Sequence, residues 1–166
     1  MSLERLWTPW RLAYVSGGEK SEACVFCAAL DSDDAAPLIV FRGTSSFVIL
    51  NLFPYNNAHL MVVPQRHVAS LAETTPEERA ELIDLAAVAE TAILEAYAPH
   101  GMNMGINLGK PAGAGIPGHL HLHVVPRWNG DTNFMTVVGH TRVLPEELPV
   151  TATKLRPIFE RLTSSR

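Results

Sequence analysis

The stretch Gly118-His119-Leu120-His121-Leu122-His123-Val124-Val125-Pro126 alternates three histidines with apolar residues. Such alternation predicts an extended strand, whose successive side chains point to opposite faces of a sheet. The three imidazoles would then line one face, about 6.6 Å apart. Buried imidazoles need hydrogen bonds, a metal or a reaction partner. We therefore expect the functional site to lie on this strand. The alternative is that the three histidines are structural and only form hydrogen bonds to neighbouring groups.

The composition predicts one globular domain over residues 1–166. Hydrophobic residues make up 47% of the chain and charged residues 18%, as in ordinary globular proteins. The net charge of -4 argues against a nucleic-acid-coating protein, but a few local donors can still hold a small anion. We find no apolar run of about 18 residues and no signal peptide, so we expect no membrane partner. Two closely spaced cysteines favour a reducing compartment, which predicts a cytoplasmic protein.

Five segments have strand-like sequences, and residues 42–45 look like a hairpin connection between the first two. The segments are residues 38–41, 46–52, 59–64, 102–108 and the histidine strand. One helix is expected between the third and fourth strands, so the order predicts a mainly antiparallel sheet covered on one face by helices.

The long helix has a clear beginning. Thr75 suits the N-cap, Pro76 the first helical position and Glu78 the reciprocal position of a capping box. An apolar stripe at helical spacing should pack on the sheet; it comprises Leu82, Ala86, Ala89, Ile93 and Tyr97.

The two ends of the chain form an N-terminal arm, residues 1–22, and a C-terminal extension, residues 128–166. The arm carries Trp7 and Trp10, which are expected to pack on the body, on a partner subunit or beside a ligand pocket. Residues 134–144 are expected to be extended, and a second amphipathic helix follows. Pro157 lies inside that helix and is a local conflict.

A glycine-rich loop, residues 109–118, precedes the histidine strand. Its glycines let the backbone approach a ligand, and successive N–H groups in such a loop can hold a phosphate. Lys110 and Arg127 bracket the loop and could add positive charge. A flexible connection is the alternative, since the spacing matches neither the P-loop nor the dinucleotide fingerprint.

The middle histidine, His121, is the best candidate nucleophile, because an imidazole that is neutral near pH 7 can attack phosphorus. A catalytic metal held by all three histidines is the alternative, but alternating ligands on a flat strand converge poorly on one tetrahedral ion. Cys24 and Cys27 form half of a zinc site, to be completed by two histidines. A redox pair is the competing interpretation.

These motifs resemble the histidine triad superfamily, whose signature of three alternating histidines followed by two apolar residues is matched by residues 119–125. Residues 51–59 and 63–67 also look like its elements, although Ala58 stands where the family usually has Gly. The arm at residues 6–11, the loop at 112–117 and the tail at 128–134 are similar to the prokaryotic diadenosine tetraphosphate phosphorylase branch, also called ATP adenylyltransferase.

The resemblance implies an α+β fold with a five-stranded antiparallel sheet, one long helix and a C-terminal helix, and a homodimer with a ten-stranded sheet. It implies that His121 attacks the α-phosphorus, with His123 and His59 assisting. The residues expected to bind substrate are Asn51, Asn107, Lys110, Gly113, Gly115 and Arg127. The ligands expected for a structural zinc are Cys24, Cys27, His67 and His119. No organic cofactor is expected.

The predicted reaction converts diadenosine tetraphosphate and phosphate to ATP and ADP through a nucleotidyl-histidine intermediate, so the partners are adenine nucleotides and phosphate. Two alternatives remain within the superfamily, a dinucleoside polyphosphate hydrolase and a nucleoside phosphoramidase. A third alternative is a nucleotide-binding module without catalysis.

Overall fold

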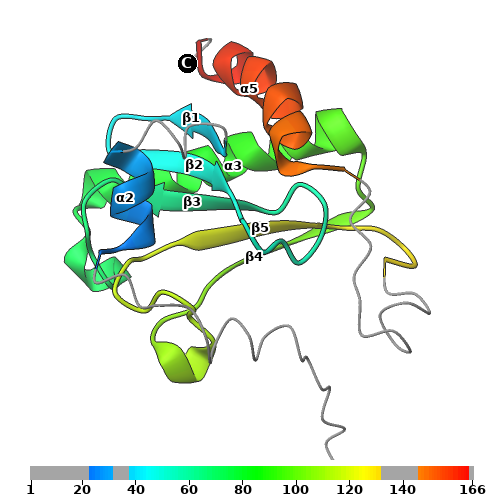
Figure 1. Ribbon diagram of the computed structural model, residues 1–166. Coiled ribbons are helices and arrows are strands. Elements are labelled where there is room, and N and C mark those ends of the chain that lie inside the picture. Colours follow the sequence, from blue (N-terminus) through cyan, green and yellow to red (C-terminus); the bar gives the residue numbers. More distant parts are fainter. Residues whose placement is uncertain (1–22, 32–37, 132–145, 165–166) are drawn as a thin grey trace, which may run out of the picture.

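The computed structural model describes residues 23–31, 38–131 and 146–164 (Figure 1). The N-terminal arm with Trp7 and Trp10, and the extended segment expected over residues 134–144, lie outside these ranges. The described residues form one five-stranded sheet with helices packed against it.

All neighbouring strands of the sheet pair antiparallel, in the order β1-β2-β3-β5-β4. The strands are β1 (Ile39–Arg42), β2 (Ser46–Leu50), β3 (Leu60–Pro64), β4 (Gly101–Ile106) and β5 (Leu122–Arg127). The predicted antiparallel sheet is confirmed, as is the hairpin between β1 and β2. β4 is an outer strand, so within the described residues one of its edges has no neighbouring strand.

The long helix α3 (Pro76–Tyr97) begins as the sequence predicts. The Thr75 side chain accepts from the Glu78 backbone N–H, and the Glu78 carboxylate accepts from the Thr75 N–H, which completes the capping box. The helix ends where Ala98 turns left-handed at φ 44°. Four residues of the predicted stripe are buried and Tyr97 packs at its end, so the apolar periodicity positions the helix on the sheet.

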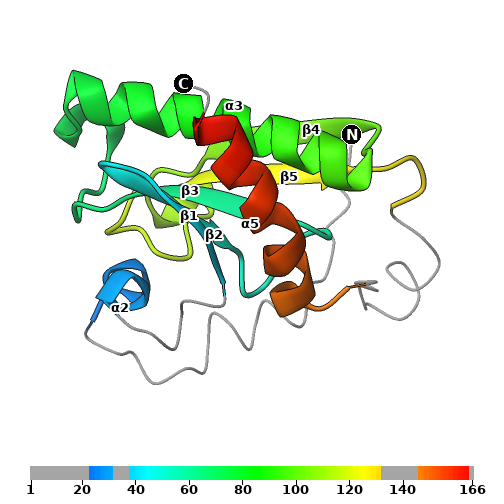
Figure 2. The same cartoon turned by 90° about the horizontal axis from the view of Figure 1, so that it is seen from above.

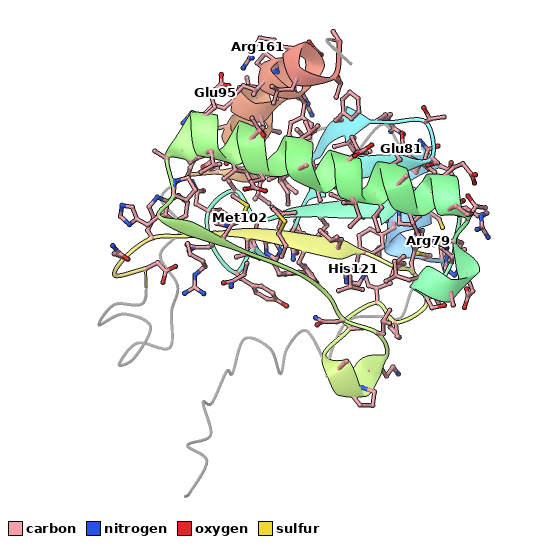
Figure 3. All side chains as sticks on the ribbon, turned by 180° about the vertical axis from the view of Figure 1, so that it is seen from behind. Arg79, Glu81, Glu95, Met102, His121 and Arg161 are labelled. Atoms are coloured by element: carbon pink, nitrogen blue, oxygen red, sulfur yellow. The ribbon has the colours of Figure 1, made fainter. Side chains whose placement is uncertain are left out.

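Helices cover both faces of the sheet (Figure 2). α3 and α5 (Leu148–Ser164) share a core with one face, and an ion pair between Arg161 and Glu95 joins their surfaces (Figure 3). α2 (Val25–Asp31) packs on the opposite face through Phe26 and Ala29. The expectation of helices on one face only was therefore incomplete, because α2 is too short to show an apolar stripe. α5 accommodates Pro157 in its interior.

The histidine strand begins later than predicted. β5 starts at Leu122, so His123 lies in the strand while His119 and His121 precede it. The backbone N–H of Leu120 donates to the Val68 carbonyl at 2.7 Å. This bond takes the chain away from β3, whose pairing with β5 reaches only to Val62 opposite Leu122. The prediction that one strand contains all three histidines is therefore wrong, since only His123 lies in β5.

Within the part of the chain that the structure describes, no helix has the length and apolar character needed to cross a membrane.

The capping box of α3 should contribute measurably to stability. We expect Thr75→Ala to lower the free energy of unfolding by about 1 kcal/mol, since it removes the acceptor of the Glu78 N–H. Thr91→Ala is the matched control, because Thr91 lies exposed within the same helix and alanine is the better helix former there. Urea unfolding of both variants measures the difference in unfolding free energy. Equal changes in the two variants would show that the cap does not contribute to stability.

Candidate functional site

Four potential metal ligands converge from three separate segments. Cys24 and Cys27 lie at the start of α2, His67 follows β3 and His119 precedes β5. Their ligand atoms all lie within 4.8 Å of one another. The sequence-predicted set is thus brought together, although its members span 95 positions of the chain.

The donor atoms fit a tetrahedral ion. The Sγ of Cys24 lies 3.2 Å from Nδ1 of His119, and the Sγ of Cys27 lies 3.4 Å from Nδ1 of His67 and 3.7 Å from that of His119. Ligand bonds of zinc length separate sulfur from nitrogen by about 3.6 Å in a tetrahedron. Burial and the neighbouring Cys24 raise the pKa of Cys27, because a thiolate there would be poorly solvated and close to a second sulfur. A bound cation would offset both effects.

The His119 ring is oriented for such an ion. Its Nε2 lies 2.8 Å from the Pro64 carbonyl oxygen, which can only accept a hydrogen bond. Nε2 therefore carries the proton, and the Nδ1 lone pair faces the thiols. A backbone carbonyl behind the outer nitrogen is a common way to orient a metal-binding histidine.

His121 has the opposite tautomer. Its Nδ1 lies 2.8 Å from the backbone carbonyl of His119, so Nδ1 carries the proton and Nε2 keeps a lone pair. His121 is 4% exposed, and its ring contacts Phe26, whose ring also lies against His119. Burial lowers the pKa of His121, which favours the neutral form. In Figure 3, His121 lies at the start of β5, near the loop that follows β4.

His59 and His123 form a directional pair. The backbone N–H of Tyr55 donates to Nδ1 of His59 at 3.0 Å, so the His59 proton resides on Nε2. That nitrogen lies 2.9 Å from Nδ1 of His123, which therefore accepts, leaving the His123 proton on Nε2. The rings of His121 and His123 are 4.9 Å apart. Nε2 of His121 thus offers a lone pair, and Nε2 of the neighbouring His123 ring offers an N–H donor.

The glycine-rich loop begins beside the histidines. Ile106 pairs with Leu122 in the sheet, so Asn107 and the following loop start next to His121. Lys110–Ala112 forms a short 3-10 turn between Gly109 and Gly113. These glycines have φ of 77° and 96°, values that a residue with a side chain rarely adopts. Gly115 and Lys110 are exposed.

Two of the residues predicted to bind substrate, Asn51 and Arg127, form hydrogen bonds within the chain. The Asn51 side chain lies 3.4 Å from Nδ1 of His59 and accepts from the Phe53 N–H, which places it at the His59 pair. Arg127 lies four residues beyond His123 on β5, about 13 Å away along the strand. It pairs with Asp131 and donates to Asn103 on β4, so the structure does not bring Arg127 to the glycine loop.

Sequence reasoning missed two contributors to the site. Phe26 lies between the two cysteines and packs on His119 and His121. Tyr55 supplies its backbone N–H to His59, and its ring lies 4.7 Å from that imidazole. The position of Phe26 inside the Cys-x-x-Cys motif was an available signal, whereas a backbone donor leaves no mark in the sequence.

Known proteins have sequences similar to that of this chain. Residues 34–130 match the model of the HIT domain. An AP-4-A phosphorylase of Mycobacterium tuberculosis is 43% identical over 154 residues, covering 88% of this chain and 79% of the relative. The resemblance to that branch of the superfamily is thereby confirmed.

Solved structures have a similar fold. A Zn-bound histidine triad family protein from Mycobacterium smegmatis superimposes with a TM-score of 0.69 at 31% identity, covering 87% of this chain and 98% of the other. A hypothetical histidine triad nucleotide-binding protein from Sulfolobus tokodaii has the same TM-score at 25% identity, covering 84% and 94%.

His123 should remain neutral well into acid. Burial, and next the charge of His121, lower its pKa from 6.5 to about 4. Between these values the unfolded chain binds more protons than the folded one, so this group makes stability fall as the pH drops from about 6.5 to 4. Nuclear magnetic resonance titration should give a His123 midpoint near 4. In His123→Gln, unfolding free energy should fall less steeply over that range, and an identical slope would contradict the assignment.

Proposed function

The chain belongs to the HIT domain family, and we propose that it is a nucleotidyl transferase that converts diadenosine tetraphosphate and phosphate to ATP and ADP. The observation that carries this proposal is His121, whose Nδ1 proton is held by a backbone carbonyl so that Nε2 presents a lone pair. The similarity to an AP-4-A phosphorylase supports the choice of substrate.

In the first step, Nε2 of His121 attacks the α-phosphorus of the dinucleotide. A nitrogen–phosphorus bond forms, the bond from phosphorus to the bridging oxygen breaks, and ATP leaves with that electron pair. The His119 carbonyl keeps its hydrogen bond to Nδ1 and stabilises the positive charge that develops on the ring. The product is AMP joined to His121, which is covalent catalysis by an imidazole.

His123 is suited to assist the leaving group. Its Nδ1 accepts from His59, so its Nε2–H can donate to the oxygen that gains charge as the bond breaks. His59 in turn is fixed by Tyr55. The N–H groups of Ala112, Gly113 and Ala114 donate within the glycine loop. The N–H groups from Gly115 onward, with Lys110, would therefore bind the phosphate oxygens, where preorganised donors stabilise the transition state. Asn51 would contact the ribose and Asn107 the bound nucleotide.

In the second step, an oxygen of inorganic phosphate attacks the same phosphorus. The nitrogen–phosphorus bond breaks, its electron pair returns to Nε2 of His121, and ADP leaves. Water in place of phosphate would release AMP. Dividing the reaction in this way leaves the choice of product to the second nucleophile.

We assign the four-ligand cluster to zinc, held by Cys24, Cys27, His67 and His119. The ion would supply a structural cross-link between α2 and the start of β5, and the reacting groups are those of the histidines. Similarity to a Zn-bound family member supports this assignment.

A homodimer is part of the proposal. β4 is an outer strand, and its Met104 side chain is 42% exposed. Outer strands with unpaired backbone groups favour pairing with another chain, and antiparallel pairing of two β4 strands would give a ten-stranded sheet.

Phosphate dependence tests the proposed reaction. With diadenosine tetraphosphate and inorganic phosphate, we expect equal amounts of ATP and ADP. Without phosphate, we expect ATP to stop at about one equivalent per site, with AMP left on the protein as an acid-labile adduct. Chromatography of the products measures both. AMP released at the same rate with or without phosphate would indicate a hydrolase instead, and binding without turnover would indicate a nucleotide-binding module.

Replacing the nucleophile should abolish the reaction. We expect His121→Ala to lower kcat by at least about 10⁴-fold, because loss of a covalent nucleophile removes the main pathway, and to form no adduct. His100→Ala is the control, since His100 is exposed next to β4 and contacts Asn129. Wild-type turnover in His121→Ala would contradict the mechanism.

Metal analysis tests the zinc assignment. The purified protein should contain about one zinc per chain, and His67→Ala should retain much less because three donors remain. Chelation should lower the melting temperature of the wild-type protein, since bound metal stabilises the folded state. His100→Ala again serves as the control and should keep its zinc. A wild-type protein that folds fully without metal, with no response to chelator, would contradict this role.

A further inference from the structure

Beyond the end of β5, the Asp131 carboxylate collects hydrogen bonds from separate parts of the chain. Arg127 donates to it at 2.6 and 2.9 Å, and the backbone N–H of Trp128 donates at 3.3 Å. Asn56, from the turn after β2, donates at 2.9 Å. The Arg127 hydrogen bond is the main cause that lowers the pKa of Asp131 to about 2, so the carboxylate stays charged near neutral pH.

Asn56 uses its whole amide in this junction. Its Nδ2 donates to Asp131 and, at 3.1 Å, to the Pro126 carbonyl. Its Oδ1 accepts from the Asn57 N–H at 3.2 Å. One side chain therefore fastens the middle of the turn over residues 51–58 to the end of β5.

Arg127 connects the same junction to β4. Besides its two bonds to Asp131, its guanidinium donates to Oδ1 of Asn103 at 3.0 Å. Asn103 belongs to β4, so Asp131 is held against both strands of the sheet edge. The junction is a network of several hydrogen bonds. A single surface ion pair would contribute little to stability.

The turn fastened in this way carries the donor that orients the histidine pair. Tyr55 directly precedes Asn56, and its N–H donates to Nδ1 of His59. The Tyr55 ring lies 4.7 Å from the His59 ring and 5.9 Å from that of His123. A displacement of the turn would weaken this hydrogen bond, because N–H···N geometry tolerates only small changes in distance and angle.

We infer that Asn56 and Asp131 are positioning residues that select the tautomers of His59 and His123. With the Tyr55 donor in place, protons reside on Nε2 of both rings. The Asn51 Nδ2, 3.4 Å from the same nitrogen at the start of this turn, is a second and longer donor. If the turn shifts so that neither donor reaches Nδ1, His59 can carry its proton there and accept at Nε2 from Nδ1 of His123. Nε2 of His123 then holds a lone pair and cannot donate to a leaving group. The effect on turnover rests on the proposed function, whereas the tautomers do not.

Nitrogen-15 chemical shifts of the imidazoles test this inference directly, since they distinguish the two tautomers in the resting protein. We compare wild type with Asn56→Asp, which keeps the shape but loses both donors and faces Asp131 with a second negative charge. Asn56→Ala removes the side chain, and Asn57→Ala is the control in the same turn. Circular dichroism and zinc content establish that each variant is folded.

In wild type and Asn57→Ala we expect Nε2–H tautomers at His59 and His123. In both Asn56 variants we expect a mixture with the Nδ1–H form and a kcat at least about tenfold lower, as when a catalytic imidazole loses its orienting partner, with KM little changed. Unchanged tautomers in folded Asn56 variants would overturn the inference. Altered tautomers in a protein that never cleaves diadenosine tetraphosphate would overturn the proposed function alone.

Discussion

The site depends on His119, which joins the candidate metal centre to His121, the proposed nucleophile. Its Nδ1 faces the thiols, its Nε2–H is held by the Pro64 carbonyl, and its own carbonyl accepts from Nδ1 of His121. The direction of His121 is set by where that carbonyl lies. The His119 ring contacts Cys24, just before α2, and Pro64 on β3. A cysteine that lies 95 positions earlier in the sequence can therefore influence the direction of the proposed nucleophile.

Backbone groups orient these imidazoles. His119 and His121 each donate to a carbonyl, and His59 accepts from the Tyr55 N–H. In a Ser-His-Asp triad, by contrast, a carboxylate both orients the imidazole and stabilises its charged form. A neutral carbonyl fixes the tautomer with a weaker preference for the cation. Together with burial, which lowers the pKa of all three triad histidines, this keeps the His121 lone pair available.

Most of the fold was predictable because its signals are local. Thr75 and Glu78 mark the start of α3, apolar alternation marks the strands, and both features were confirmed. The departure of His119 and His121 from β5 was not predictable, because it accompanies a hydrogen bond between Leu120 and Val68, which lie 52 positions apart. In the site, residue types with distinctive chemistry were found from the sequence. The tautomers were not, because the groups that set them belong to the backbone: the carbonyls of Pro64 and His119 and the N–H of Tyr55.

The position of Arg127 shows that the two ends of β5 make different contacts. A basic residue near a glycine loop in sequence suggested phosphate binding, yet β5 is extended and carries Arg127 away from the loop by about 3.3 Å per residue. The start of the strand lies next to His121, and its end holds Asp131 and, through Asn56, the turn that bears Tyr55. His123 lies near the start of β5, and its partner His59 accepts from the Tyr55 N–H of that turn. If His121 attacks and His123 donates to the leaving group as proposed, both ends of β5 must stay in place, because movement at either end would separate the His121 lone pair from the His123 N–H.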